Sequence, residues 1–127
     1  MKRTPLVLIV DDAKDNREGY AQYLEFRGFR TAEAATGEEA LEMVPRLRPD
    51  IVLLDLRLPG VAGFEVTRRL RASRFGSTPI IALSACTFEA DIAAAKESGC
   101  DSFLGKPCLP ETVVEEINRL LGRRKGS

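Results

Sequence analysis

The chain has 127 residues, enough for one domain that buries roughly two-thirds of the surface exposed by its unfolded form. Lys plus Arg and Asp plus Glu number 19 each, and this balance argues against a strongly basic nucleic-acid-binding surface. The longest uncharged apolar run is far shorter than the ~20 residues of a membrane helix. Lys2 and Arg3 precede a strand-like run and two aspartates, not a secretory signal.

Cysteine and histidine usage restricts the chemistry further. Cys86, Cys100 and Cys108 have no C-x-x-C spacing, so we expect neither a disulfide framework nor a zinc site, and a cytoplasmic location is the default. The chain has no histidine, which excludes phosphohistidine chemistry and histidine-based triads within it. Proton or phosphate chemistry must therefore use carboxylates, lysines and hydroxyls.

Strand-like and helical segments alternate five times along the chain. Short continuous apolar runs at 6–10, 51–54 and 80–83 predict central parallel strands that are covered on both faces. The segments 29–34 and 102–105 are more polar or shorter and suit the edges of a sheet.

Apolar residues at helical spacing are clearest over 40–47 and 113–121. Thr36 and Glu39 form a capping-box pair, and Pro110 suits the first turn of a helix. Three glycines follow helical stretches and predict their C-terminal ends: Gly28, Gly99 and Gly122.

This alternation predicts an α/β fold with right-handed crossovers. We expect a flavodoxin-like, doubly wound, five-stranded parallel sheet with strand order 2-1-3-4-5 and helices on both faces. The expected organisation is a single domain over 1–127, with a core of about 5–121 and a polar stub at 122–127. Met1 lies close before the first strand, which fits an independent or amino-terminal domain, although a fragment would look the same.

Four of the apolar runs end in residues that can bind a phosphoryl group or its metal ion. Asp11 and Asp12 follow the first run, and Asp55, Ser84 and Lys106 follow three others. The carboxyl ends of parallel strands meet at one edge of an open sheet, so these side chains should converge. The sequence therefore predicts a site for Mg²⁺ and a phosphate.

The repulsion between clustered carboxylates must be compensated. Two like charges ~5 Å apart repel by about 3 kcal/mol at an effective dielectric constant near 20, so a cation must bind or one pKa must rise. Oxygen ligands without His or Cys favour a hard ion such as Mg²⁺. The alternative for Asp11 and Asp12 is a helix N-cap near Lys14.

Asp55 is followed by 58–60, Leu-Pro-Gly, in which Pro-Gly suits a type II turn that leaves the carboxylate exposed as a nucleophile. Each single residue also has a simpler interpretation. Asp55 could be a capping or solvated aspartate, Lys106 a solvated lysine, and Ser84 a turn cap before the next helix. Phe103 could be an ordinary core aromatic of an edge strand.

Four motifs occur together in this chain: the acidic pair, the aspartate before L-P-G, the L-S-A segment and the K-P dipeptide. With them, essentially the whole chain resembles the receiver domain of two-component response regulators, of the chemotaxis-regulator kind. The resemblance implies that Asp55 accepts the phosphoryl group and that Lys106 binds it. It implies Mg²⁺ as the cofactor, with these ligands: Asp11, Asp12, Asp55 and the backbone carbonyl of Arg57. Ser84 would be the switch hydroxyl and Phe103 the switch aromatic.

The same resemblance implies a regulatory phosphoacceptor with phosphotransfer and self-dephosphorylation chemistry only, not an enzyme. Its partners would be a sensor histidine kinase or a histidine phosphotransfer protein, and an output partner or domain at the face formed by the fourth helix, last strand and last helix. No nucleic acid or membrane would bind this domain.

Some positions depart from the common pattern of the family or carry a further expectation. Phe103 lacks the hydroxyl of the frequent tyrosine, and Cys108 stands where many members have an aromatic, which affects the expected partner face. By resemblance, the Lys106-Pro107 bond should be cis. Arg57 and Cys86 should flank the path of the water that hydrolyses the aspartyl phosphate, with Arg57 shielding it or pointing to solvent.

Two other classes also use this chemistry or fold. A haloacid-dehalogenase-like phosphatase needs a second aspartate two residues after the nucleophile, where this chain has Arg57. A flavodoxin-like flavin carrier needs a Gly-, Ser- or Thr-rich phosphate loop, and the acidic segment 11–15 would repel a phosphate.

Overall fold

The computed structural model describes residues 4–58, 62–85 and 89–122. The strands form one parallel sheet in the order β2-β1-β3-β4-β5, as the sequence predicts. The strands are β1 (Leu6–Val10), β2 (Arg30–Ala34), β3 (Ile51–Asp55), β4 (Ile80–Ser84) and β5 (Ser102–Gly105). The helices are α1 (Lys14–Phe26), α2 (Gly37–Leu47), α3 (Gly63–Arg71), α4 (Glu89–Ser98) and α5 (Pro110–Leu120).

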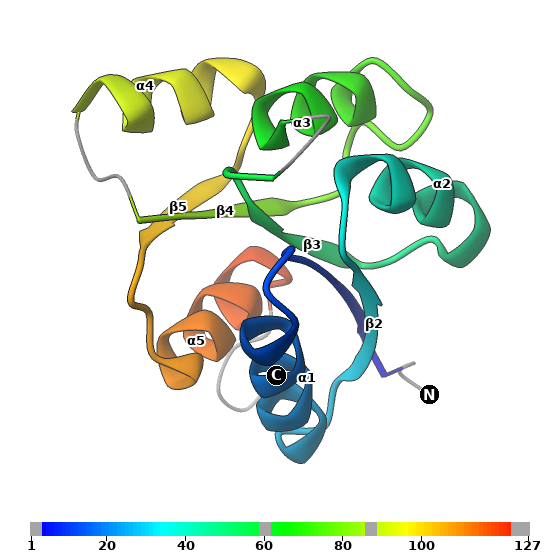
Figure 1. Cartoon of the computed structure of the whole chain (residues 1–127). Coiled ribbons are helices and arrows are strands. Elements are labelled where there is room, and N and C mark those ends of the chain that lie inside the picture. Colours follow the sequence, from blue (N-terminus) through cyan, green and yellow to red (C-terminus); the bar gives the residue numbers. More distant parts are fainter. Residues whose placement is uncertain (1–3, 59–61, 86–88, 123–127) are drawn as a thin grey trace.

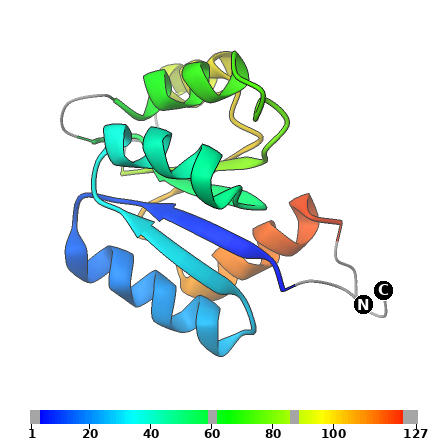
Figure 2. The same cartoon turned by 90° about the vertical axis from the view of Figure 1, so that its right-hand side faces the viewer.

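Helices cover both faces of the sheet, α1 and α5 on one and α2, α3 and α4 on the other (Figures 1 and 2). Alternate side chains of β1 point to opposite faces. Val7 and Ile9 pack in the cluster that includes residues of α1 and α5, whereas Leu8 and Val10 pack with residues of α2 and α3. All five residues of β1, β3 and β4 are buried, which explains their continuous apolar runs.

The predicted helix signals are confirmed. Thr36 is the N-cap of α2, and its Oγ1 accepts a hydrogen bond from the Glu39 N–H at 3.1 Å. The Glu39 carboxylate in turn accepts a hydrogen bond at 2.9 Å from the N–H of Ala35, one residue before the cap. Pro110 begins α5. The three glycines expected at helix ends all have positive φ: Gly28, Gly99 and Gly122.

Arg71, the last residue of α3, ties three segments together. Its guanidinium donates to the carbonyl oxygens of Gly76 at 3.0 Å and Thr78 at 2.6 Å, both before β4. It also donates to the carbonyl of Gly99 at 2.8 Å and the carboxylate of Asp101 at 2.6 Å, between α4 and β5. These contacts fix the ends of α3 and α4 opposite the edge of the sheet where the predicted site lies.

Candidate functional site

Lys106 binds two of the predicted carboxylates at the carboxyl edge of the sheet. Its Nζ lies 3.0 Å from Asp55 Oδ2 and 3.4 Å from Asp11 Oδ2. Asp11 and Asp55 are only 1% and 5% exposed, and the side chain of Lys106 is 20% exposed. The interpretation of Lys106 as a solvated surface lysine is therefore wrong.

The loop after β1 presents the acidic pair. Asp11 Oδ1 accepts a hydrogen bond from the Ala13 N–H at 2.9 Å, a turn that the short aspartate side chain favours. The N-cap of α1 is Ala13, without a side-chain cap, so the N-cap interpretation of Asp11 and Asp12 is wrong. Asp12 is exposed, and one carboxylate oxygen each of Asp11, Asp12 and Asp55 lies within 4.8 Å of the others.

Burial and the attraction between Lys106 and the carboxylates shift the pKa values of this cluster in opposite directions. Burial raises the pKa of the Asp11 carboxyl above its usual value, against the lowering effect of the Ala13 N–H and of Lys106. Burial lowers the pKa of Lys106, but the hydrogen bond and charge of Asp55, together with Asp11, raise it further than burial lowers it. Lys106 is thus held as a cation, while the carboxylates gain from any further positive charge.

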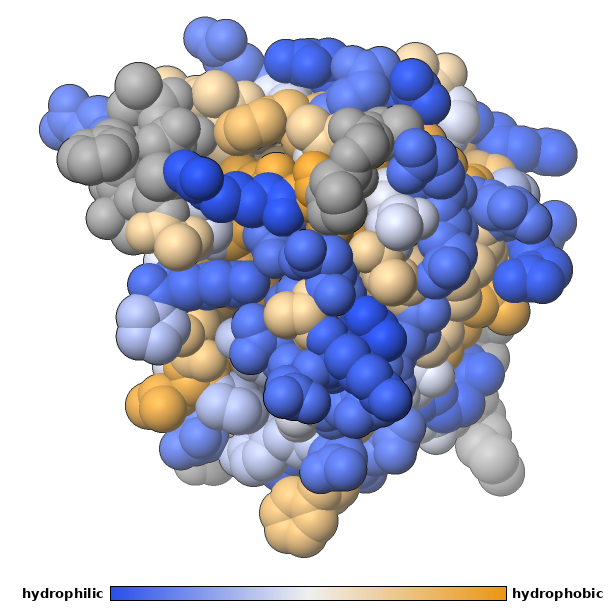
Figure 3. Space-filling model, in the orientation of Figure 1, coloured by the Kyte–Doolittle hydropathy of each residue, from blue (hydrophilic) through white to orange (hydrophobic). Residues whose placement is uncertain are grey.

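The donor set suits a hard divalent cation. Three carboxylates offer only oxygen ligands, and Asp12 leaves the cluster open to water on one side. Hydrophilic side chains cover most of the described surface on this face of the molecule, including that over α1 (Figure 3). The three aspartates fit Mg²⁺, which keeps several waters and one or two carboxylates among its ligands.

Asp55 and Ser84 end neighbouring strands. Asp55 Oδ1 accepts a hydrogen bond from the Arg57 N–H at 2.9 Å, so the carboxylate forms both a turn contact and the pair with Lys106. Ser84 is 3% exposed, and its carbonyl accepts a hydrogen bond from the Lys106 N–H at 2.8 Å. The backbone of β4 therefore holds the base of the Lys106 side chain.

Phe103 lies apart from the carboxylates. It pairs with Ala82 in the register of β4 and β5 and packs, half-buried, in a cluster with Leu56, Ala82 and Ala95. This position joins β5 to α4 and fits both a core aromatic and a side chain that responds to movement near Ser84. The Lys106-Pro107 peptide bond is cis, as expected.

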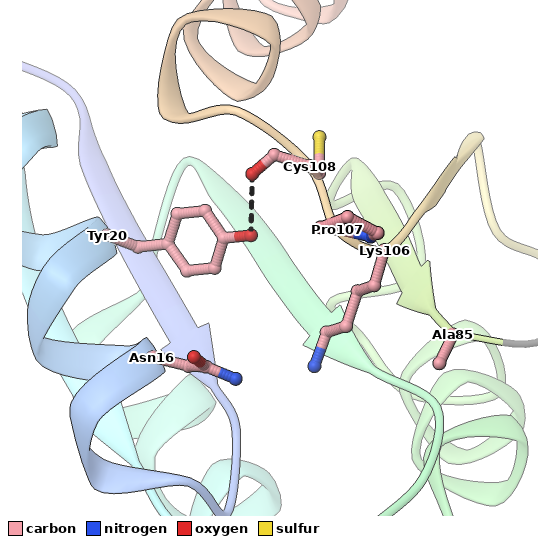
Figure 4. Close-up of a pocket in the computed structure, with 6 residues that line it drawn as sticks. All are labelled: Asn16, Tyr20, Ala85, Lys106, Pro107 and Cys108. Carbon is pink, nitrogen blue, oxygen red and sulfur yellow. Dashed lines mark hydrogen bonds between the residues drawn. The ribbon is translucent and has the colours of Figure 1, made fainter.

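A cavity of about 430 Å³ lies beside the cluster, between α1 and the segment after β5 (Figure 4). The Tyr20 hydroxyl donates to the carbonyl of Cys108 at 3.2 Å across one side of it. Its lining residues are Asn16, Tyr20, Ala85, Lys106, Pro107 and Cys108. Small groups can therefore approach Lys106 from the side of α1.

Three residues discussed above, Pro59, Gly60 and Cys86, lie outside the described residues, so the expected turn and the expected position of Cys86 are not described. One contact was not anticipated from the sequence. Arg17 donates to the backbone carbonyl of Asp11 at 3.0 Å. Nothing in the sequence distinguishes Arg17 from Lys14, an exposed cation near the same end of α1 that pairs with Glu18 instead.

Comparison with known proteins agrees with this geometry. The family model described as the response regulator receiver domain matches residues 7–118. The DNA-binding response regulator MtrA of Mycolicibacterium smegmatis is 40% identical over 119 residues, which are 94% of this chain and 51% of that regulator. The chain thus spans about half the length of this relative.

Solved structures show the same likeness. The chemotaxis protein CheY4 of Vibrio cholerae is 31% identical with a TM-score of 0.88, over 93% of this chain and 99% of that one. The receiver domain of a sensor histidine kinase from Pseudomonas aeruginosa PAO1, with a magnesium ion coordinated in its active-site cleft, is 30% identical with a TM-score of 0.87, over 94% and 99%. The phosphatase and flavin-carrier alternatives are set aside, and the chain belongs to the response regulator receiver domain family.

Proposed function

We propose that this domain accepts a phosphoryl group on Asp55 in a Mg²⁺-dependent reaction and thereby switches an interaction surface. The observation that supports the proposal most strongly is the cluster of Asp11, Asp12 and Asp55, two of which, Asp11 and Asp55, pair with Lys106 at the ends of β1, β3 and β5. The donor would be a phosphohistidine of a sensor kinase or phosphotransfer protein. We place the domain in the cytoplasm with that donor.

Each residue has a distinct part in the proposed transfer. A carboxylate oxygen of Asp55 attacks phosphorus, the bond from phosphorus to the donor imidazole nitrogen breaks, and that nitrogen keeps the electron pair. Asp11, Asp12, Asp55 and the carbonyl of Arg57 would hold Mg²⁺, which would supply charge compensation for the incoming phosphoryl oxygens. Lys106, now 3.0 Å from Asp55 Oδ2, exchanges that oxygen for a phosphoryl oxygen.

The switch would follow from the new acceptor oxygens. The Ser84 hydroxyl donates to one of them and draws the segment after β4 toward Asp55. Phe103 then repacks, and because it shares a cluster with Ala95 of α4, the movement alters the face formed by α4, β5 and α5. Phosphorylation only has to shift the balance between two conformations that already exist.

The test uses a small phosphodonor, since it needs no identified kinase. The domain is incubated with acetyl phosphate and MgCl₂ and its intact mass is followed over time. We expect wild type to gain one phosphoryl group, Asp55→Asn to gain none, and a chelator to suppress the reaction. The control Asp15→Asn removes an exposed carboxylate in the first turn of α1 and should react as wild type does. Equal phosphorylation of Asp55→Asn would refute the assignment.

A further inference from the structure

Arg17 bridges three elements beneath the acidic loop. Its Nε donates to Glu33 Oε1 of β2 at 3.0 Å, and its Nη1 donates to the backbone carbonyl of Asp11 at 3.0 Å. The side chain is 15% exposed, although it belongs to a surface helix. Holding a long side chain in one rotamer costs conformational entropy, so these two hydrogen bonds indicate that the side chain of Arg17 has a structural role.

The contact with Asp11 acts on the backbone that leads to Asp12. The peptide unit from Asp11 Cα to Asp12 Cα is planar and rigid. A donor that fixes its carbonyl oxygen therefore fixes the orientation of the whole unit, including the Asp12 N–H. Because the Asp11 N–H is also bound, to the carbonyl of Ala34 at 3.1 Å, the chain is held on both sides of Asp11, and the position of the Asp12 Cα, from which its side chain starts, is set.

Asp12 is the acidic residue that most needs such support. Asp11 and Asp55 are buried and paired with Lys106, whereas Asp12 is exposed. Its carboxylate nevertheless lies with theirs, one oxygen of each within 4.8 Å of the others, so holding it there against their repulsion costs free energy until a cation binds. Groups that orient metal ligands from behind reduce this cost.

We infer that Arg17 is a positioning residue for the divalent-cation site, and that it acts by holding the Asp11 carbonyl so that the Asp12 carboxylate faces the cation. The inference rests on the proposed function, because it needs Mg²⁺ at Asp11, Asp12 and Asp55. Arg17 contacts neither the cation nor the phosphoryl group. Glu33 orients the guanidinium.

A positioning role and electrostatics alone predict opposite changes in Mg²⁺ affinity when Arg17 is replaced by methionine. Arg17 carries a positive charge near a cation site, so electrostatics alone predicts that Arg17→Met tightens Mg²⁺ binding. Positioning predicts weaker binding, by about tenfold, the lower end of the effect typical for groups that orient metal ligands. For Arg17→Lys, electrostatics predicts no change. Positioning again predicts weaker binding, because one ammonium cannot reproduce the guanidinium fork.

The test is calorimetric titration of the domain with MgCl₂ at a temperature where circular dichroism shows each variant fully folded. A loss of affinity of about fivefold or more in Arg17→Met supports the inference, and unchanged or tighter binding overturns it. If that variant does not fold, Arg17→Lys decides by the same criterion. The control Arg27→Met removes a cation from the other end of α1, where Arg27 contacts Tyr23, and should leave affinity within about twofold of wild type.

Failure of this inference differs from failure of the proposed function. If wild type shows no Mg²⁺ binding, the proposed site itself is wrong. If wild type binds Mg²⁺ and Arg17→Met binds it equally well, the site stands and only the positioning role of Arg17 is refuted.

Discussion

Lys106→Met removes a cation that contacts both buried carboxylates while nearly keeping the length of the side chain. In wild type the ammonium lies 3.0 Å from Asp55 Oδ2 and 3.4 Å from Asp11 Oδ2. Without it, Asp11 and Asp55 lose this shared counter-charge when no metal ion is bound. We therefore expect the variant to be less stable in chelator.

The size of the loss follows from these distances. At an effective dielectric constant near 20, each pair at 3.0 or 3.4 Å has a gross attraction of about 5 kcal/mol. Much of this is offset by the desolvation of the ammonium, and removal of one partner from a buried pair typically costs about 3–5 kcal/mol. Because Lys106 keeps some contact with water, we expect a loss of about 2–3 kcal/mol in the free energy of unfolding.

The loss should depend on pH in a defined direction. Burial already raises the pKa of Asp11 in the folded state, and removal of Lys106 raises it further. Between the unfolded and folded pKa values, the folded state binds more protons, so stability falls as pH rises through this window. The penalty of Lys106→Met should therefore be larger at pH 8 than at pH 5. Saturating Mg²⁺ should reduce it, since the metal replaces the missing charge.

Urea unfolding followed by circular dichroism measures this effect, in chelator and in MgCl₂ at both pH values. The matched control is Lys14→Met, which removes an exposed lysine 3.9 Å from Glu18 and should change little. A loss below about 0.5 kcal/mol at pH 8 in chelator, or an equal loss in Mg²⁺, would refute the role of Lys106 as the counter-charge.

Three further predictions concern the surroundings of the site. Arg71→Met should lower the free energy of unfolding by about 2–3 kcal/mol, because it leaves several backbone carbonyls without their donor. The control Arg69→Met replaces an exposed arginine and should leave that free energy nearly unchanged, so equal urea midpoints for the two variants would contradict the prediction. Gly63→Ala should lower the melting temperature, since the added Cβ would lie 2.6 Å from the Cα of Leu56, and an unchanged melting temperature would show that the loop adapts. Arg57→Ala should shorten the half-life of the phosphorylated domain, because Arg57 is expected to shield the aspartyl phosphate from water. An unchanged or longer half-life would refute this shielding and leave the assignment of Asp55 untouched.

Much of the fold follows from local pattern. Runs such as Leu6–Val10 are apolar throughout because helices cover both faces of the sheet, so the strands could be predicted. Their order follows from the flavodoxin-like fold class that the alternation indicates. The site could be predicted for a related reason, since residues that directly follow such strands must share one edge. Asp11, Asp55 and Lys106 meet there as expected.

Other features depend on contacts that sequence spacing does not encode. Arg17 and Arg71 look like ordinary surface arginines in the sequence, and only the fold brings backbone carbonyls within their reach. α4 (Glu89–Ser98) is rich in alanine and has little periodicity, so its bounds could not be predicted. α2 continues past Pro45 to Leu47, as the helical spacing over 40–47 predicts, although proline alone would favour an earlier end.

The most direct test of the account identifies the phosphorylated atom in the wild-type chain. The domain is phosphorylated with acetyl phosphate and MgCl₂, reduced with borohydride, which converts an aspartyl phosphate to homoserine, and digested with trypsin. Cleavage after Arg46 and Arg57 gives a peptide that contains both Asp50 and Asp55, and fragmentation distinguishes the two. We predict homoserine at position 55 alone. Homoserine at Asp50, Asp11 or Asp12 in place of position 55 would contradict it.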